Sequence, residues 1–335
     1  MLEKQSIIII YYSFILVTCF TQMTNIHALE AEGKSEVVTL ETENKGLKKE
    51  NKINQSHKFV SQQLMRLTNW FDSFFGNKKY LLEQNGSRIR FFNTTNKFEK
   101  NEMTNDNGYR VSLRFPNLEN LLQINIERRG EEESGATPTP ETRLTTENVR
   151  DEGAVRASVS ALYRKSKKLD FKFTAGYKFE IPPFPFLNFR VSLEDKIFTK
   201  WKYRFISSSF WEEPIGQGQS FSYDFDRKIT KDTLFRFVNE YSWFKEPMIE
   251  NFSHGPSLFH RLNQKNALSY NFRAKFNQKW KDRADQYAAS IVYRHNIFKE
   301  WFFYELVPLI QYNQVENYVA KHGISIKFEI AIGDY

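Results

Sequence analysis

The chain has 335 residues, of which 40% are hydrophobic and 16% aromatic, and its formal net charge is +8 at pH 7. Its mean hydropathy of −0.59 excludes a helical membrane protein, because beyond the N-terminus no run of about 18 apolar residues occurs. Many aromatic residues at low mean hydropathy are typical of a β-barrel, whose polar inner face lowers the average. A basic chain often binds nucleic acid, but the N-terminal segment predicts export, so we expect no nucleic acid partner.

Residues 1–28 are interpreted as a cleaved signal peptide. A short polar start precedes an apolar stretch at 7–20, and small residues follow, with a plausible cleavage position after Ala28. The stretch is too short to cross a bilayer as a helix, so a membrane anchor is the weaker alternative. The only cysteine, Cys19, lies inside it. The mature chain is therefore expected to have no disulfide and no thiol nucleophile.

Two further segments precede the strands. Residues 29–57 are polar and lack periodicity, which predicts a flexible segment. Residues 58–86 are predicted to hold one periplasmic amphipathic helix, at about 59–75, and a linker. Gly76 can end the helix, and its apolar positions recur at helical spacing, at Val60, Leu64, Leu67, Phe71 and Phe74. We expect the helix to pack on the end of the barrel; a plug, or a foot on the inner leaflet of the outer membrane, are the alternatives.

From residue 87 to residue 335 the pattern predicts one all-β domain, an antiparallel up-and-down transmembrane β-barrel. In FKFTAGYKF (171–179), apolar and polar residues alternate with the period of a strand. Similar runs predict about fourteen strands, within a range of about 12–16. They are expected at 87–92, 108–115, 121–128, 154–164, 170–180, 186–197, 201–211, 218–228, 233–244, 256–262, 266–278, 286–297, 301–312 and 322–334.

The connections and strand lengths favour a membrane barrel over a soluble β-sandwich. Short connections are expected at 116–120, 166–168, 230–232, 264–266 and 299–300, and longer polar ones at 93–108, 130–154, 249–255, 278–285 and 314–322. This alternation is typical of outer-membrane barrels. Many predicted strands have nine or more residues, as a tilted strand needs to cross a bilayer, whereas strands of soluble sheets are typically about five or six residues long.

The alternation also assigns side chains to faces. The lumen is predicted to be lined by basic residues, namely Arg110, Arg114, Arg156, Lys172, Lys178, Arg190, Arg204, Arg236, Arg273, Lys275 and Lys327. Aromatic residues near strand ends are predicted to lie at the lipid interface, namely Trp201, Trp211, Trp243 and Trp301. A cationic lumen favours anions. Alternatively, these charges pair across strands and line a filled interior.

The segments NWFDSFFG, RFPNLENLLQINI and KEWFFYELVPLIQY resemble those of an uncharacterised family of Gram-negative, proteobacterial outer-membrane β-barrel proteins. The ending ISIKFEIAIGDY looks like the terminal strand that the barrel assembly machinery recognises. Tyr335 departs from that pattern, because it is out of phase with the apolar face at Ile324, Phe328 and Ile332. The resemblance implies an outer-membrane location, with outer-membrane lipid and the assembly machinery as partners. It implies no established activity.

Three functions stay open. A diffusion pore for small polar or anionic solutes comes first, because fourteen strands allow an aqueous lumen. A structural or surface-interaction barrel with a closed lumen is the alternative. A hydrolase is less expected, because the candidate groups form no familiar catalytic pattern. These candidates are His254 with Ser253 and Ser257, the strand residues His260 and His295, and the pair Asp224 and Asp226. We predict no enzyme, no cofactor and no metal site, and the sequence indicates no oligomeric state.

Overall fold

The structure is a computed structural model. It describes residues 63–75, 87–99, 102–115, 121–128, 154–166, 168–197, 200–213, 216–245, 249–277, 283–298 and 301–333. The predicted signal peptide, the polar segment at 29–57, most of the predicted 130–154 loop and Tyr335 lie outside these residues. Among the helices that the structure describes, none is long and apolar enough to cross a membrane.

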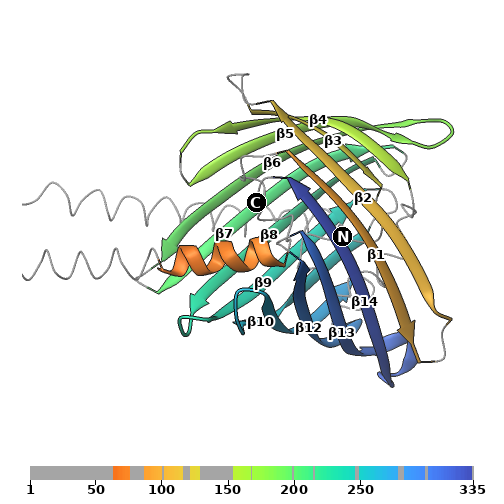
Figure 1. Ribbon diagram of the computed structural model, residues 1–335. Helices are drawn as coiled ribbons and strands as arrows, with labels where there is room; N and C mark the ends of the chain where they lie inside the picture. The colour runs from red at the N-terminus through yellow and green to blue at the C-terminus, as the bar shows by residue number, and fades with distance from the viewer. Residues whose placement is uncertain are drawn as a thin grey trace, which may run out of the picture. The chain divides into compact units, whose positions relative to one another are not determined.

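Fourteen antiparallel strands close into one barrel, as the sequence predicts (Figure 1). Each strand pairs with its neighbour in the chain, and β1 pairs with β14 to close the wall. The strands are β1 (Arg88–Phe98), β2 (Thr104–Phe115), β3 (Leu121–Arg128), β4 (Val155–Arg164), β5 (Leu169–Phe179), β6 (Phe184–Ile197), β7 (Trp201–Glu212), β8 (Gly216–Lys228), β9 (Thr233–Phe244), β10 (Ile249–Arg261), β11 (Asn266–Asn277), β12 (Gln286–Phe298), β13 (Phe302–Asn313) and β14 (Ala320–Gly333).

Two of the long loops expected from the sequence are largely strand. The predicted loop at 93–108 contains the end of β1 and the start of β2, which pair with one another up to Asn96 and Thr104. Asn93 donates hydrogen bonds to the side chains of Asn105 and Asn107, at 2.8 and 2.7 Å, so polar residues that favour turns are held here by a cross-strand ladder. Likewise, the whole of the predicted loop at 249–255 belongs to β10 and pairs with β9. Long and short connections therefore alternate less clearly than the sequence predicts.

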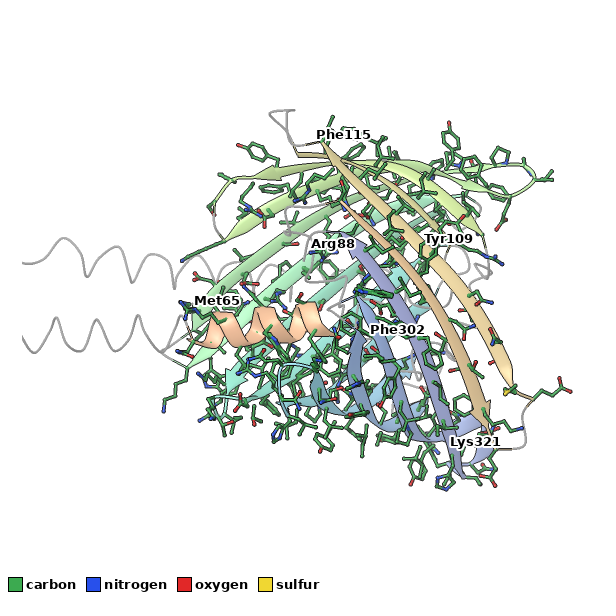
Figure 2. The ribbon with its side chains drawn as sticks, in the orientation of Figure 1. Met65, Arg88, Tyr109, Phe115, Phe302 and Lys321 are labelled. Carbon is green, nitrogen blue, oxygen red and sulfur yellow. The ribbon has the colours of Figure 1, made fainter. Side chains whose placement is uncertain are left out.

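The two faces of the wall differ sharply in exposure. On β14, the side chains of Ile324, Ile326 and Phe328 are 43%, 38% and 45% exposed, whereas the intervening Ser325 and Lys327 are 1% and 4% exposed. Exposed large apolar residues recur on most of the strands, and Figure 2 shows side chains of this outer surface around Tyr109, Phe115 and Phe302. A soluble protein rarely exposes so continuous an apolar surface. The outer face is the lipid-facing face of a transmembrane barrel.

The helix at 63–74 lies inside the barrel. Its residues Leu64, Phe71 and Phe74 are buried. They belong to one buried cluster with the inward side chains of Leu234, Phe259, Ala267, Val292, Phe303, Val307 and Ala331. These residues come from every strand between β9 and β14, and the helix also contacts Arg204 on β7 and Lys228 on β8, so the wall surrounds the helix on these strands. This favours the plug placement over the expected packing on the end of the barrel.

The helix occupies one end of the interior. Leu234 is the second residue of β9 and Phe303 is the second residue of β13, while Phe259 lies near the end of β10. All three therefore lie at the end that carries the turns 229–232 and 262–265, here called the short-turn end; the opposite end is the far end. In Figure 2, Arg88 marks the short-turn end and Lys321 lies near the far end.

Candidate functional site

The register places all of the predicted basic residues on one face of the wall, the face that meets the helix. Residues that pair directly across antiparallel strands share a face. Arg110 pairs with Glu127, which pairs with Arg156, which in turn pairs with Lys178. Lys172 pairs with Arg190. Arg204 and Arg236 contact the helix. The other predicted basic residues lie on the same face of their strands. That these residues select solutes stays a prediction.

Two regions of the inner surface differ, and β1 lies between them. We call strands β7–β14 the helix-facing wall. The described helix contacts Arg204 on β7, Lys228 on β8 and Phe303 on β13, and Ala331 on β14 belongs to the same buried cluster. Strands β2–β6 form the basic wall, which carries Arg110, Arg114, Lys172 and Arg190. Among the described residues, the helix makes no hydrogen bond, ion pair or ring contact with β2–β6.

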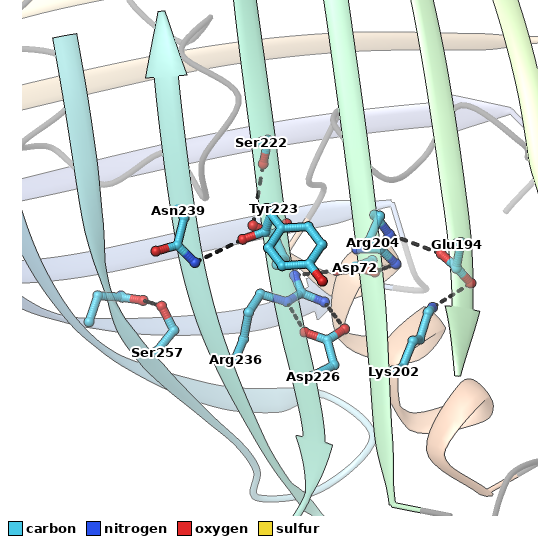
Figure 3. Close-up of polar contacts among 12 residues, drawn as sticks. Asp72, Glu194, Lys202, Arg204, Ser222, Tyr223, Asp226, Arg236, Asn239 and Ser257 are labelled. Atoms are coloured by element: carbon cyan, nitrogen blue, oxygen red, sulfur yellow. Dashed lines mark hydrogen bonds and ion pairs between the residues drawn. The ribbon is translucent and has the colours of Figure 1, made fainter. Parts of the chain in front are cut away.

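Asp72 joins the helix to the helix-facing wall. Its two carboxylate oxygens accept hydrogen bonds from Arg236 at 2.8 Å and from Arg204 at 3.2 Å (Figure 3). Arg236 also donates two hydrogen bonds to Asp226, at 2.6 and 2.9 Å, and Arg204 donates one to Glu194 at 2.9 Å. All these groups except Glu194 are buried. Buried charges are stable only when they are paired, so these arginines are neutralised where the helix docks.

A second ion-pair cluster lies between β12, β13, β14 and β1. Arg294 pairs with Glu305, and with Glu329 at 3.1 Å. Glu329 also pairs with Arg90 at 3.0 Å and with Lys327 at 3.4 Å. Arg294, Glu305, Glu329 and Lys327 are buried. Arg204, Arg236, Arg294 and Lys327 on the helix-facing wall are thus matched by carboxylates, as the alternative interpretation of the sequence anticipates for a filled interior.

An aromatic layer completes the contact with the helix. The rings of Trp70 and Phe74 stack with centroids 4.7 Å apart, and Phe71 contacts Phe259 at 5.4 Å. Arg261, the last residue of β10, places its guanidinium 5.0 Å from the centre of the Trp70 ring, and it donates a hydrogen bond of 2.7 Å to Asp232 in the short turn. This hydrogen bond lowers the pKa of Asp232 below its ordinary value of 3.8.

The basic wall has a different arrangement of charge. Lys172 and Arg190 lie directly opposite one another on β5 and β6, and like charges in this position repel. Arg114 and Arg110 are also within electrostatic range of Lys172, as is Glu127. These side chains are half-buried. Within the described residues, no carboxylate lies within ion-pair distance of the Lys172 amine.

Polar side chains fill the space between these cations. Ser112 donates a hydrogen bond to Asn125 at 2.9 Å, Asn125 donates one to Ser160 at 3.2 Å, and Ser160 and Thr174 are 2.9 Å apart. This series of hydrogen bonds crosses β2, β3, β4 and β5, and Thr174 pairs with Asn188 on β6. The basic wall therefore offers hydroxyl and amide groups between its positive charges.

An ion pair lies across the wall at the far end. Arg156 on β4 donates two hydrogen bonds to Glu212, the last residue of β7, at 2.9 and 2.7 Å. The Arg156 guanidinium also lies 5.2 Å from the centre of the Phe186 ring. Arg156 and Glu212 are buried, so this predicted lumen cation is neutralised by a partner that the sequence analysis did not identify.

The predicted interface tryptophans divide between the two ends of the barrel. Trp201 begins β7 and Trp301 immediately precedes β13, so both lie at the short-turn end. Trp211 and Trp243 lie near the far ends of β7 and β9. Trp211 and Trp301 are 38% and 40% exposed. This arrangement fits two aromatic girdles, and contact with lipid headgroups stays a prediction.

The candidate hydrolase residues are not brought together. His254 lies on the outer face, among the rings of Phe237, Phe252 and Phe276, whereas Ser257 faces inward and donates a hydrogen bond to Asn271 at 2.8 Å.

The other candidates are also engaged elsewhere. Asp224 accepts a hydrogen bond from Ser222 at 3.3 Å, and Asp226 pairs with Arg236. His295 contacts Asn266 and Tyr304. Among the described residues, no group of three His, Cys, Asp or Glu residues is placed to hold a metal ion.

Comparisons with known proteins complete the description. No protein-family model matches the chain, and no curated protein matches it. Among solved structures, a loop-deletion mutant of OmpT, an outer membrane protein of Vibrio cholerae, is 11% identical, with a TM-score of 0.47 over 74% of this chain and 100% of that one. The outer membrane channel DcaP of Acinetobacter baumannii is 8% identical, with a TM-score of 0.46 over 74% and 96%. OccK11 of Pseudomonas aeruginosa is 7% identical, with a TM-score of 0.44 over 75% and 96%.

Proposed function

We propose that this protein is an outer-membrane channel that favours small anionic solutes, and that these solutes pass along the basic wall. The observation that carries the proposal is the difference between the two walls. The helix occupies the helix-facing wall, and carboxylates pair with Arg204, Arg236 and Arg294 there. On the basic wall, Lys172 and Arg190 stay half-buried and opposite one another, where positive side chains favour anion passage.

The barrel's size supports this function. Barrels of eight strands are filled by side chains, whereas those of 16 to 18 leave an aqueous channel; fourteen strands with one enclosed helix lie between these cases. The exposed apolar face supports an outer-membrane location, since transmembrane barrels of this kind belong to outer membranes. Outer-membrane lipid and the barrel assembly machinery are the corresponding partners.

The test is a salt-gradient measurement. The refolded barrel is inserted in a planar bilayer, and the reversal potential of single-channel current is recorded. We expect anion preference, and a variant with Arg114→Gln, Lys172→Gln and Arg190→Gln is expected to lose most of it. Cation preference of the unaltered protein would contradict the assignment of the basic wall. Absence of current from a demonstrably folded barrel would contradict the channel itself.

A closed barrel is the second candidate, and the enclosed helix favours it. Asp72 and the aromatic layer fix the helix at the short-turn end through buried contacts. If these contacts seal the interior, the protein is a structural or surface-binding barrel. The same recordings separate the two functions, because a sealed barrel conducts only after the helix is displaced.

A further inference from the structure

The two ends of the barrel differ in the charge that they expose. Among the described residues, exposed carboxylates occur only at the far end, where exposed basic side chains occur as well. The acidic residues are Glu99, Glu102, Glu180 and Glu213, and the basic ones include Arg128, Lys245 and Arg283. The described carboxylates of the short-turn end, such as Asp195 and Asp232, are half-buried or buried.

Exposed cations follow one another around the short-turn end. They lie in or beside the connections β4–β5, β6–β7, β8–β9 and β10–β11, which form a continuous arc of the wall. We call this set the cationic rim, and it consists of Lys165, Lys168, Lys200, Arg227, Lys231 and Lys265.

Only part of the charge of the cationic rim is matched within the chain. Lys168 pairs with Asp195 at 2.7 Å, and the Lys231 amine lies 3.9 Å from the Asp232 carboxylate. The other lysines of the rim form no ion pair with a described residue. The described part of the short-turn end therefore presents net positive charge.

Exposed apolar and aromatic side chains reach the same turns. Tyr163 and Ile229 are 61% and 54% exposed, and each lies two residues before a rim lysine. Leu262, in the β10–β11 turn, is 48% exposed. Trp201 begins β7, and the Arg227 guanidinium lies 5.2 Å from the centre of its ring. Aromatic rings of transmembrane barrels lie at the membrane interface, so the rim cations lie at the depth of lipid headgroups.

This combination distinguishes a lipid surface from a soluble acidic partner. A soluble partner would need cations that extend away from the membrane, and apolar side chains between them would serve no purpose. Lys and Arg side chains at a membrane surface instead bury their carbon chains and keep the charge at headgroup level. Basic residues in this position attract anionic lipids. Short turns of outer-membrane barrels face the periplasm, so the leaflet concerned is the inner one.

We infer that the cationic rim binds anionic phospholipid headgroups, that is, phosphate diesters without a compensating cation, in the leaflet around the short-turn end. The Lys and Arg side chains donate charge-assisted hydrogen bonds to phosphate oxygens, while the exposed apolar side chains beside them contact the glycerol and the acyl chains. The bound lipids hold this end of the barrel at a fixed depth. The inference does not depend on the channel function, because it concerns the rim and not the interior.

The experiment uses the refolded protein in phosphatidylcholine vesicles that contain a trace of spin-labelled lipid in both leaflets. Electron paramagnetic resonance distinguishes lipid held at the protein from free lipid. The probes are phosphatidylglycerol, whose phosphate has no compensating cation, and phosphatidylcholine, whose headgroup has no net charge. We expect an association constant about fivefold larger for phosphatidylglycerol, and a smaller ratio of the two constants at high salt.

A variant with Lys165→Gln, Lys200→Gln and Lys265→Gln is expected to lower this ratio to about twofold or less. Replacement of the same lysines by Arg should preserve it, because the charge is retained. The matched control carries Arg128→Gln, Lys245→Gln and Arg283→Gln, which remove the same charge from exposed positions at the far end. Because the labelled lipid reaches both ends, this control should preserve the ratio only if the rim is the binding surface.

Equal association constants for the two lipids in the unaltered protein would overturn the inference. A ratio that survives in the Gln variant, or that falls equally in the far-end control, would also overturn it. Replacement of chloride by glycerol phosphate at constant ionic strength should leave the ratio unchanged; a fall would show that the rim binds soluble phosphate esters instead of lipid. If the Gln variant fails to fold, the single variants are measured, and each should lower the ratio.

Discussion

The helix-facing wall and the basic wall both carry charged side chains, but Arg236 and Lys172 differ in their partners. On the helix-facing wall, Arg236 is 1% exposed and is held between Asp72 and Asp226. On the basic wall, Lys172 is half-buried and faces Arg190. The difference comes from the helix, which brings a carboxylate and apolar rings to one side only. An inward cation therefore indicates a pore only when its carboxylate partners are known.

The strongest way to break this difference is to reverse the charge of Asp72. Asp72→Lys would place a third cation between Arg204 and Arg236. Removing the partner of a buried charge costs about 3–5 kcal/mol, which corresponds to a shift of more than about a hundredfold in the docking equilibrium of the helix. We expect the helix to leave its position and single-channel conductance to rise.

Asn69→Lys is the matched control for this variant, because it adds the same charge at an exposed position of the same helix. It should leave the conductance unchanged. If Asp72→Lys folds and conducts like the unaltered protein, then the helix does not limit passage.

A smaller effect is expected from the buried ring of Phe92 on β1. Phe92 lies over Gly108, and a Cβ added at Gly108 would lie 2.0 Å from the ring's Cζ. Gly108→Ala should therefore destabilise the barrel by about 1–3 kcal/mol through overpacking, as measured by urea unfolding. Phe92→Leu in the same chain should restore part of the loss. Additive losses in the double variant would contradict the contact.

The selectivity of the two walls can be compared with one substitution in each. Lys172→Gln removes a charge from the basic wall. A unit charge at about 4 Å is worth roughly 1 kcal/mol in water, so we expect the anion-to-cation permeability ratio to fall about fivefold. Lys327→Gln should lower it less, because Lys327 is buried beside Glu329. Equal effects in reversal-potential measurements would show that the two walls do not differ.

The smallest expected effect concerns the turn that supports Trp70. Because Arg261 lowers the pKa of Asp232, the stabilisation from this carboxylate is present at neutral pH and is lost as the pH falls through its lowered value. Asp232→Asn should remove this acid dependence from the fluorescence of Trp70, taken as the difference from a Trp70→Phe variant. Asp195→Asn, which removes the partner of Lys168 in another part of the wall, should not change it.

Sequence patterns predict the strands of the wall better than the position of the helix inside it. The bounds of β3 and β9 agree with the predicted ranges 121–128 and 233–244, because apolar and polar residues alternate throughout them. The start of β10 was predicted as a loop since IENFSHG is polar and contains Gly255. Pairing with β9 holds this segment as a strand, and no local sequence pattern predicts that pairing.

The placement of the helix could not be predicted from its own residues. The spacing of Leu64, Leu67, Phe71 and Phe74 indicates an apolar face, but such a face fits the rim of a barrel, a lipid surface or an interior equally well. Asp72 was the missed signal. An acidic residue directly beside this apolar face requires a basic partner when it is buried, and the wall supplies two. Glu212 was missed because its partner Arg156 lies three strands away in the barrel.

The pairing of β1 with β14 sets the order in which the protein can be assembled. The helix precedes every strand in the chain, yet the seam that encloses it forms between the first strand and the last. Before the final strand arrives, the helix can therefore enter through the open side of the unfinished barrel. A contact between the two ends of a chain is slow to form, so the unfinished barrel has time to position Asp72 between Arg204 and Arg236. Once β1 pairs with β14, the helix can no longer leave through the wall, and it can leave only through an end of the barrel.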